Sequence, residues 1–223
     1  MKIYIKTKKF ILDSRLSYSK LIQILIQKYG IKVSKSSISY YKRTQKRLKE
    51  PRSQSIRENE FEWLKGLFLA DGCKFKGKNY EYVIKFALDQ RRDIKIINKL
   101  TGIFDKLQVH CTRSSQGKAS IFRVFNKTLF NNLPESNIFY KPKNNLAFLS
   151  GLIDGDGCKH GRGAILVQSK NKVTMNYLVK ELNITKYSKF VQTNFGRFRI
   201  IQYYIPKSIC STITKENLSE KLS

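Results

Sequence analysis

Apolar and polar residues follow helical and strand-like periods along the chain, and beyond the first quarter the same order of periods occurs twice. In the earlier unit, helical spacing over 59–70 predicts the first helix. Asp93 begins a further helix whose inner face carries Ile94, Ile97 and Leu100. The other elements of this unit are predicted as strands near 73–78, 80–88, 107–113 and 119–125, and as a short helix over 126–133.

The later unit predicts the same order of elements. Helical spacing returns over 145–155 and 172–182, and a last helix begins near Pro206. Alternation of polar and apolar residues is typical of half-buried strands, and it occurs over 164–168 and 198–203, with a hairpin around 194–196. Each unit is therefore αββαββα in outline, and the fold class is α+β with two similar halves.

The N-terminal segment has a different pattern. Residues 17–28 predict a helix that carries Leu21, Ile24 and Leu25 on one face, and a second helix follows from Ser34. The two helices resemble a helix-turn-helix, and a generic helical hairpin that serves as a basic arm is the alternative. In a helix-turn-helix, the residues expected in a DNA major groove are Lys35, Ser36, Ser39 and Tyr40, and those expected on phosphates are Lys42, Arg43 and Arg47.

A polar, proline-broken stretch over 49–55 separates this segment from the two units. The predicted domains are therefore 1–57, 58–143 and 144–223.

Charge narrows the choice of partner. The chain of 223 residues has 44 Lys and Arg against 16 Asp and Glu, a formal net charge of +28. Self-repulsion of this size favours a polyanionic partner, and nucleic acid is the first candidate. A membrane surface is the competitor, but no sufficiently long basic amphipathic helix and no apolar run long enough for a membrane span is evident. Because the first residues lack the apolar run of a secretory signal, we expect an intracellular protein. The high Lys, Ile and Tyr content suggests an archaeal or organellar source.

One segment is nearly repeated. Residues 64–74 read LKGLFLADGCK, and residues 149–159 read LSGLIDGDGCK. In the first copy Gly66 and Ala70 are four residues apart, and in the second copy Gly151 and Gly155 are. Small residues at this spacing share one helix face and allow two helix backbones to approach closely. We therefore expect the two motif helices to pack against each other.

Asp71 and Asp156 end the two motif helices. A helix C-terminus disfavours an anion, and two carboxylates brought together repel each other. A divalent cation would reverse both effects, so the pair predicts a metal site. An ordinary turn after each helix is the alternative, and the repetition of the motif argues against it. The four cysteines do not have the spacing of a structural zinc site.

The two segments resemble the paired motifs of LAGLIDADG homing endonucleases in their single-chain form. The resemblance implies that the two αββαββα halves form a saddle on double-stranded DNA. It implies hydrolysis of both strands of a long site, in a monomer that is intron-encoded. It also implies Mg²⁺, or Mn²⁺ or another divalent cation, held by Asp71 and the Ala70 carbonyl and by Asp156 and the Gly155 carbonyl.

Further family positions transfer to this sequence. Gln90 and Gln168 correspond to glutamines that position the attacking water, and the cations that follow them stabilise phosphate charge. The alternative is that these residues are groove-facing polar side chains. The lysine that follows the last helix of a half corresponds to Lys141, and Lys221 is the candidate in the second half.

The motifs depart from the family pattern at one position. Motif one has Leu69 where motif two has the acid Asp154, which predicts asymmetry between the halves rather than loss of activity.

DNA contacts are expected from outward-facing residues of the strands and their ends, because long polar side chains on a twisted sheet can follow a major groove. The candidates are Lys74, Lys76, Lys78, Lys85, Arg91, Arg92, Arg113, Arg123, Lys159, Arg162, Lys170, Gln192, Arg197, Arg199 and Gln202. Two other functions remain open on the same fold without cleavage: an RNA maturase and a DNA-binding regulator.

Overall fold

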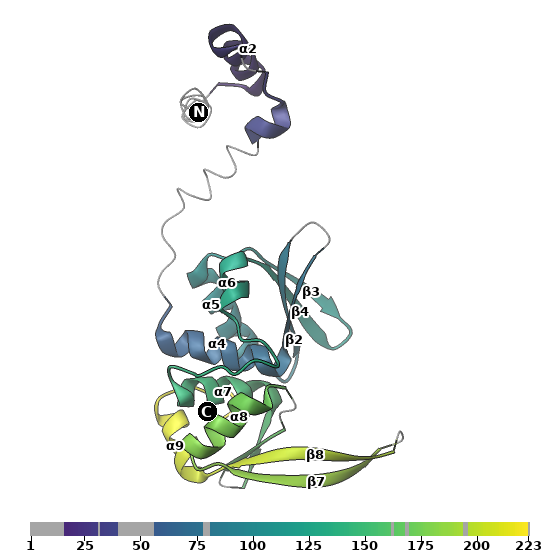
Figure 1. The fold of residues 1–223 in the computed structure, drawn as a ribbon, viewed down its shortest axis with the longest axis vertical. Coiled ribbons are helices and arrows are strands. Elements are labelled where there is room, and N and C mark those ends of the chain that lie inside the picture. The colour runs from purple at the N-terminus through teal and green to yellow at the C-terminus, as the bar shows by residue number, and fades with distance from the viewer. Residues whose placement is uncertain are drawn as a thin grey trace. The chain divides into compact units, whose positions relative to one another are not determined.

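The computed structural model describes residues 16–30, 32–39, 56–77, 81–161, 163–167, 170–193 and 196–222 (Figure 1). The chain divides into two compact units, Met1–Arg52 and Ser53–Ser223. Within the described residues, no helix combines the length and the apolar character that crossing a membrane requires.

In the first unit, helix α2 (Tyr18–Tyr29) begins at Ser17, whose hydroxyl accepts from the Lys20 amide, and ends at Gly30 in the left-handed conformation. A second helical segment covers 35–39. Leu21, Leu25 and Ile38 are fully buried and join the two helices. The two predicted helices are confirmed as far as the structure describes them. Tyr40, Lys42, Arg43 and Arg47 lie outside the described residues.

In the second unit, the first seven elements form one half. They are α4 (Glu58–Asp71), β1 (Gly72–Lys76), β2 (Tyr82–Asp89), α5 (Ile94–Leu107), β3 (Cys111–Gln116), β4 (Ala119–Phe125) and α6 (Lys127–Asn132). The strands form one antiparallel sheet in the order β1-β2-β4-β3.

The next seven elements repeat this arrangement. They are α7 (Asn145–Asp156), β5 (Gly157–His160), β6 (Gly163–Leu166), α8 (Lys172–Glu181), β7 (Thr185–Thr193), β8 (Gly196–Ile205) and α9 (Lys207–Lys215). Their sheet has the equivalent order β5-β6-β8-β7. The predicted pair of αββαββα halves is therefore confirmed. The β7–β8 ribbon extends beyond the rest of its half (Figure 1).

Each half has its own hydrophobic core between its sheet and its helices. In the first half the core includes Phe86, Leu100 and Phe122, and in the second half it includes Phe148 and Tyr203.

Ile94 does not lie on the inner face of its helix, where the sequence predicts it. It is 57% exposed, because it is the first residue of α5 and precedes the buried residues of that helix. The strand predicted from residue 107 also differs in its start. It begins only at Cys111, because α5 continues to Leu107 and Gln108 ends the helix in the left-handed conformation.

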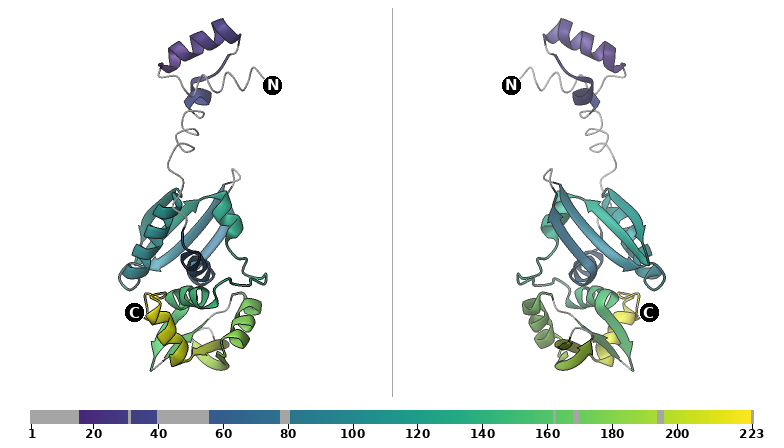
Figure 2. Two further views of the ribbon diagram at one scale, coloured as in Figure 1. Left: turned by 90° about the vertical axis from the view of Figure 1, so that its left-hand side faces the viewer. Right: turned by 90° about the vertical axis from the view of Figure 1, so that its right-hand side faces the viewer.

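The two motif helices, α4 and α7, lie side by side at the junction of the halves (Figure 2). A methyl group on Gly66 would overlap the Phe148 carbonyl oxygen, and one on Gly151 would overlap the Trp63 carbonyl oxygen. The glycines therefore allow backbone-to-backbone contact in both directions, which confirms the packing that the small residues predict.

Candidate metal centre and nucleic-acid face

The carboxyl groups of the two motifs meet where α4 and α7 end. Asp71 and Asp156 are the last residues of these helices. A methyl group on Gly155 would overlap the Ala70 side chain and would lie 3.0 Å from Asp71 Oδ2. Because Gly155 has no side chain, there is room beside it for the Asp71 carboxyl group. Gly155 immediately precedes Asp156, so the two carboxyl groups are close enough for their charges to interact.

Both carboxyl groups are held in an environment that disfavours their charge. The pKa of Asp71 is raised to about 6, chiefly by burial and further by the negative charges of Asp156 and Asp93. Burial also raises the pKa of Asp156. The ammonium groups of Lys170 and Lys221 oppose both shifts. A half-buried carboxyl pair with raised pKa values is typical of a site that gains from a bound cation.

Two lysine side chains reach the backbone at the ends of the motif helices. Lys170 Nζ donates to the Ala70 carbonyl at 2.8 Å and to the Gly72 carbonyl at 3.4 Å. Lys221 Nζ donates to the Gly155 carbonyl at 2.7 Å and to the Gly157 carbonyl at 3.4 Å. Each motif thus presents an equivalent pair of carbonyl oxygens to one positive charge.

These groups fit a hard divalent cation. The donors are two carboxylates and two carbonyl oxygens, and each of these carbonyls already accepts from an ammonium group. Mg²⁺ and Ca²⁺ take oxygen ligands of this kind. Within the described part of the chain, no group of three or more His, Cys, Asp or Glu side chains offers another metal site. The chemistry of the donors therefore favours Mg²⁺ over zinc at this junction.

The other predicted catalytic residues have different positions. Gln90 is half-buried at the end of β2, and its Nε2 donates to the Ala119 carbonyl at 3.0 Å. Arg91 and Arg92, which follow it, are exposed. Lys141 lies exposed in the segment between α6 and α7. Gln168 is outside the described residues. Of the predicted cations that the structure describes, Lys170 and Lys221 reach the ends of the motif helices.

In the sequence Asp154 marks only an asymmetry between the motifs, whereas in the structure it has a defined role. It is fully buried, and its carboxylate accepts hydrogen bonds from Trp63 and from three consecutive residues, Ser219, Glu220 and Lys221. No local sequence pattern links a helix acid to partners so distant in the chain. An acid inside an apolar helix was the available signal, since such a group must find hydrogen-bond donors.

The register of the first sheet separates the predicted DNA contacts into two sets. Lys85 pairs with Arg123, so both side chains share the face away from the core residue Phe86. Lys74, by contrast, pairs with the core residue Ile84, which puts it on the helix side. Since strand side chains alternate, Lys76 lies on the same side as Lys74.

Lys74 is already bound on that side. Its ammonium group donates to the Phe130 and Leu133 carbonyls and pairs with Glu135, and its side chain is 8% exposed. Arg113 is also engaged on the core side, where it donates to Ser120 and lies over the Phe122 ring. The structure therefore does not support Lys74 as a DNA contact, and Lys85 and Arg123 are better placed.

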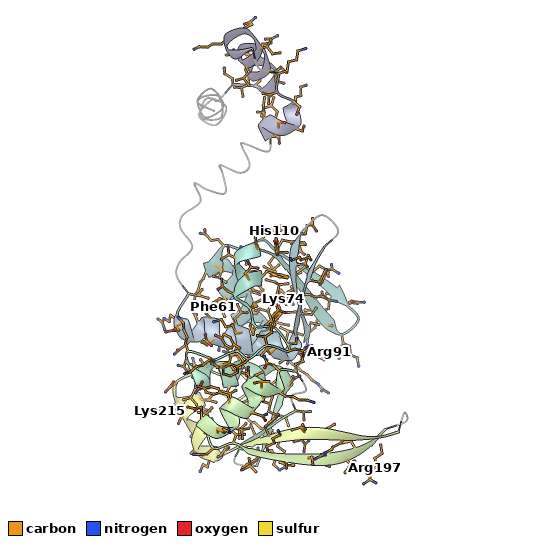
Figure 3. The ribbon with its side chains drawn as sticks, viewed as in Figure 1. Phe61, Lys74, Arg91, His110, Arg197 and Lys215 are labelled. Atoms are coloured by element: carbon orange, nitrogen blue, oxygen red, sulfur yellow. The ribbon has the colours of Figure 1, made fainter. Side chains whose placement is uncertain are left out.

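In the second sheet, Lys159 pairs with the core residue Ala164 and so faces the helices. Arg197 and Arg199 alternate along β8 and share one side of the ribbon with Phe190, over whose ring the Arg197 guanidinium lies (Figure 3). Both arginines are exposed, although alternation along β8 puts them on the side of the core residue Tyr203. Gln202 is half-buried and pairs with Tyr187. Lys78 and Arg162, and the side chain of Gln192, lie outside the description.

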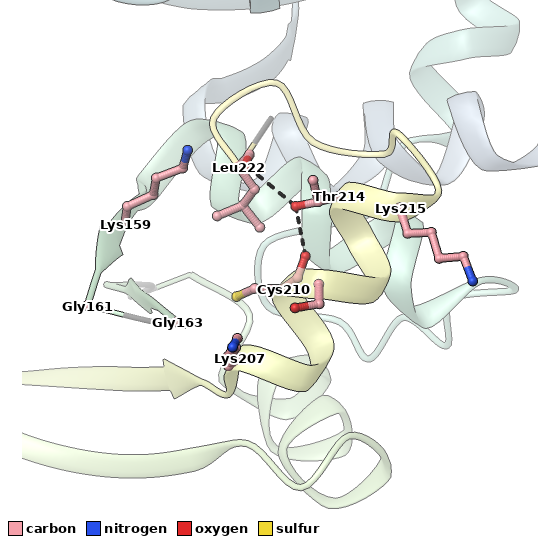
Figure 4. A pocket seen from close by; sticks show the side chains of 9 residues that line it. Lys159, Gly161, Gly163, Lys207, Cys210, Thr214, Lys215 and Leu222 are labelled. Atoms are coloured by element: carbon pink, nitrogen blue, oxygen red, sulfur yellow. Dashed lines mark hydrogen bonds between the residues drawn. The ribbon is translucent and has the colours of Figure 1, made fainter.

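A cavity of about 520 Å³ lies on the helix side of this sheet (Figure 4). Its lining includes Lys159, Gly163 and residues of α9 such as Cys210. Lys159 and Lys215 lie on opposite sides of it (Figure 4). The cavity does not include the motif carboxyl groups, so it is separate from the candidate metal centre.

No model of a known protein family and no curated protein matches the sequence. Solved structures of I-DmoI do match. Its complex with DNA and Ca has a TM-score of 0.54 and 20% identity, and the match covers 74% of this chain and 93% of that one. Its complex with DNA and Mn has a TM-score of 0.52 and 20% identity, covering 73% and 98%. A single-substitution variant of I-DmoI with its target DNA and Mg has a TM-score of 0.51 and 20% identity, covering 70% and 94%. The chain therefore has the fold of I-DmoI, a two-motif single-chain LAGLIDADG homing endonuclease.

Proposed function

We propose that the protein is a site-specific endonuclease that hydrolyses both strands of a long double-stranded DNA site with Mg²⁺. The observation that carries this proposal is the meeting of Asp71 and Asp156 at the junction of α4 and α7, beside carbonyl oxygens that already hold positive charge. The shared fold supports it, because I-DmoI was crystallised with its target DNA and divalent metals.

The ligands of the metal would be Asp71 with the Ala70 carbonyl and Asp156 with the Gly155 carbonyl. Bound there, Mg²⁺ supplies charge relief to the phosphodiester and lowers the pKa of the attacking water. In the metal-free protein Lys170 and Lys221 donate to these same carbonyl oxygens. Once a cation took the carbonyls, the two ammonium groups would be free to donate hydrogen bonds to phosphate oxygens, where negative charge develops in the transition state. Gln90 is the candidate for orienting the water in the first half.

DNA binding would use the open face of the first sheet and the exposed ribbon of the second. Lys85 and Arg123 form a cross-strand basic pair on that open face, and Arg197 and Arg199 are exposed along the β7–β8 ribbon, on the side that Tyr203 shares. In the N-terminal unit, exposed Lys35 and Ser36 and half-buried Ser39 are further candidates. Because one chain carries both motifs, we expect a monomer to cut without a partner protein, as an intron-encoded enzyme would.

The test is cleavage of a plasmid library that carries randomised inserts, with Mg²⁺ or with EDTA. We expect the wild-type protein to linearise plasmids with one recurrent site, only in the presence of Mg²⁺. Asp71→Asn and Asp156→Asn should not cut, and Asp105→Asn is their matched control. Asp105 is an exposed acid near the C-terminal end of α5 and outside both motifs, so its replacement should leave cleavage unchanged. Binding of DNA or intron RNA without cutting in Mg²⁺ would reject the endonuclease and favour the regulator or the maturase.

A further inference from the structure

We propose that Asp154 is a positioning residue that fixes Lys221 at the second motif, so that one DNA strand depends on Asp154 and the other does not. The inference rests on the proposed endonuclease function. It follows from the hydrogen bonds of Asp154, from the reach of Lys221 and from the different arrangement in the first half.

The Asp154 carboxylate accepts from both backbone and side-chain donors of residues 219–221. Oδ1 accepts from Ser219 Oγ at 2.6 Å and from the Lys221 amide at 3.0 Å. Oδ2 accepts from the Glu220 amide at 3.0 Å and from Trp63 Nε1 at 2.8 Å. Four donors around a fully buried carboxylate make this a satisfied, rigid anchor rather than a free acid.

This anchor determines where the Lys221 side chain can go. The Lys221 amide is bound to Asp154, while its ammonium group is bound to the carbonyl of the next residue, Gly155, at 2.7 Å. A short closed path therefore joins Asp154, Lys221 and Gly155. A flexible lysine that is restrained at both ends has lost rotamer freedom before substrate arrives, which is how supporting residues prepare a site.

The first half is arranged differently. At the position of Asp154 it has Leu69, which is 2% exposed and packs with the apolar core of the second half. The Ala70 carbonyl is instead served by Lys170, which reaches it from the second half. The residue after Lys170, Asn171, is anchored by its side chain: Nδ2 donates to the Glu135 and Ile138 carbonyls, and Oδ1 accepts from the Thr174 amide at the start of α8. The two lysines thus have independent anchors, so a change at Asp154 should act on one strand.

The experiment compares strand-resolved cleavage rates of the wild type with those of Asp154→Leu, which copies motif one, Lys221→Met and the double variant. We expect Asp154→Leu to slow one strand by about 10- to 100-fold and to accumulate nicked DNA, because outer-shell partners are worth this much. Lys221→Met should slow the same strand. In the Lys221→Met background, Asp154→Leu should add less than about twofold, since the two residues act as a unit.

Trp63→Phe is the matched control. It removes one hydrogen bond to the same carboxylate without touching the Lys221 backbone, so it should lower the melting temperature and leave the ratio of the two strand rates unchanged. Equal slowing of both strands by Asp154→Leu, or full additivity with Lys221→Met, would overturn the inference and reduce Asp154 to a stability residue.

A second readout does not need activity. In the metal-free protein, the acetylation rate of Lys221, followed by peptide mass spectrometry, should rise several-fold in Asp154→Leu while that of Lys170 stays constant. An unchanged Lys221 rate would contradict the positioning role. A wild-type protein that never cuts would reject the endonuclease proposal, and the acetylation measurement would still decide whether Asp154 fixes Lys221.

Discussion

The two halves of the second unit have the same order of elements and the same sheet topology, but they equip their motifs differently. In the second half, an anchored lysine of the same half reaches the motif carbonyl, through Asp154 and Lys221. In the first half, Leu69 replaces the anchor and the lysine comes from the other half. The backbone is thus more nearly symmetric than the arrangement of the two lysines. Helix packing needs only small residues at matching positions, whereas each ammonium group needs its own anchoring residue.

The comparison also shows what the halves share. Each motif helix ends in an acid, and each acid follows a carbonyl oxygen that accepts from an ammonium group. If these shared groups perform the chemistry, both must be needed, whereas the unshared groups should tune one strand each.

The largest expected effect comes from the shared acids. Asp71→Asn and Asp156→Asn should each lower double-strand cleavage by more than about 100-fold, because a metal ligand is worth more than the outer-shell partners that support it. The measurement is single-turnover cleavage of the mapped site with Mg²⁺. Either variant cutting at the wild-type rate would show that its acid is structural.

The lysines should separate the strands. Lys170→Met and Lys221→Met should each slow cleavage by about 10- to 100-fold, and mainly on opposite strands, because each ammonium group serves one motif. Labelling the 5′ end of each strand in turn measures this. The same strand responding to both variants would contradict the assignment of one lysine to each motif.

The glycines test the symmetric part of the comparison. Gly66→Ala and Gly151→Ala should each destabilise the fold by about 1–3 kcal/mol, because either methyl group would overlap a carbonyl oxygen of the facing helix. Gly102→Ala is the control: Gly102 lies in α5 with open space around it, so alanine should stabilise by about 0.4–1 kcal/mol. Urea denaturation measures all three, and a neutral Gly151→Ala would contradict the close approach of the helices.

The smallest expected effect is the pH dependence of Asp71. Its raised pKa, about 6, means that the folded protein holds this proton more tightly than the unfolded chain does. Folding stability contributed by the neutral carboxyl is therefore present at low pH and lost as the pH rises towards 6.

Asp71→Asn should consequently match the wild type near pH 4 and exceed it by about 1 kcal/mol above pH 6, after allowance for the solvent that the half-buried group still contacts. Thermal unfolding of the metal-free proteins between pH 4 and pH 8 measures the difference. A gap that shrinks as the pH rises would contradict the raised pKa.

Much of the fold could be predicted from the sequence, because it rests on local patterns. The αββαββα order follows from periodicity, and the close packing of α4 on α7 follows from Gly66, Ala70, Gly151 and Gly155. The meeting of Asp71 and Asp156 at the helix ends follows from that packing. The start of β3 was missed because a left-handed residue, Gln108, ended α5 without a glycine.

The surroundings of the acids could not be predicted in the same way. The sequence predicts Lys170 as a DNA contact, but no local pattern shows that its ammonium group binds the Ala70 carbonyl of the other half, a contact between residues far apart in sequence. The partners of Asp154 are equally distant. The sequence predicts Lys74 on the open sheet face. In the structure Lys74 pairs with Ile84, which turns it inward, and strand boundaries alone do not fix this register.

The most direct test of the central claim is the position of metal in a crystal of the protein bound to its mapped DNA site, located by the anomalous scattering of Mn²⁺. The account predicts anomalous peaks at the junction of α4 and α7, in contact with Asp71 and Asp156 and beside the scissile phosphates. DNA bound in register with no peak at these carboxylates, and with Lys170 and Lys221 still on the motif carbonyls, would contradict it.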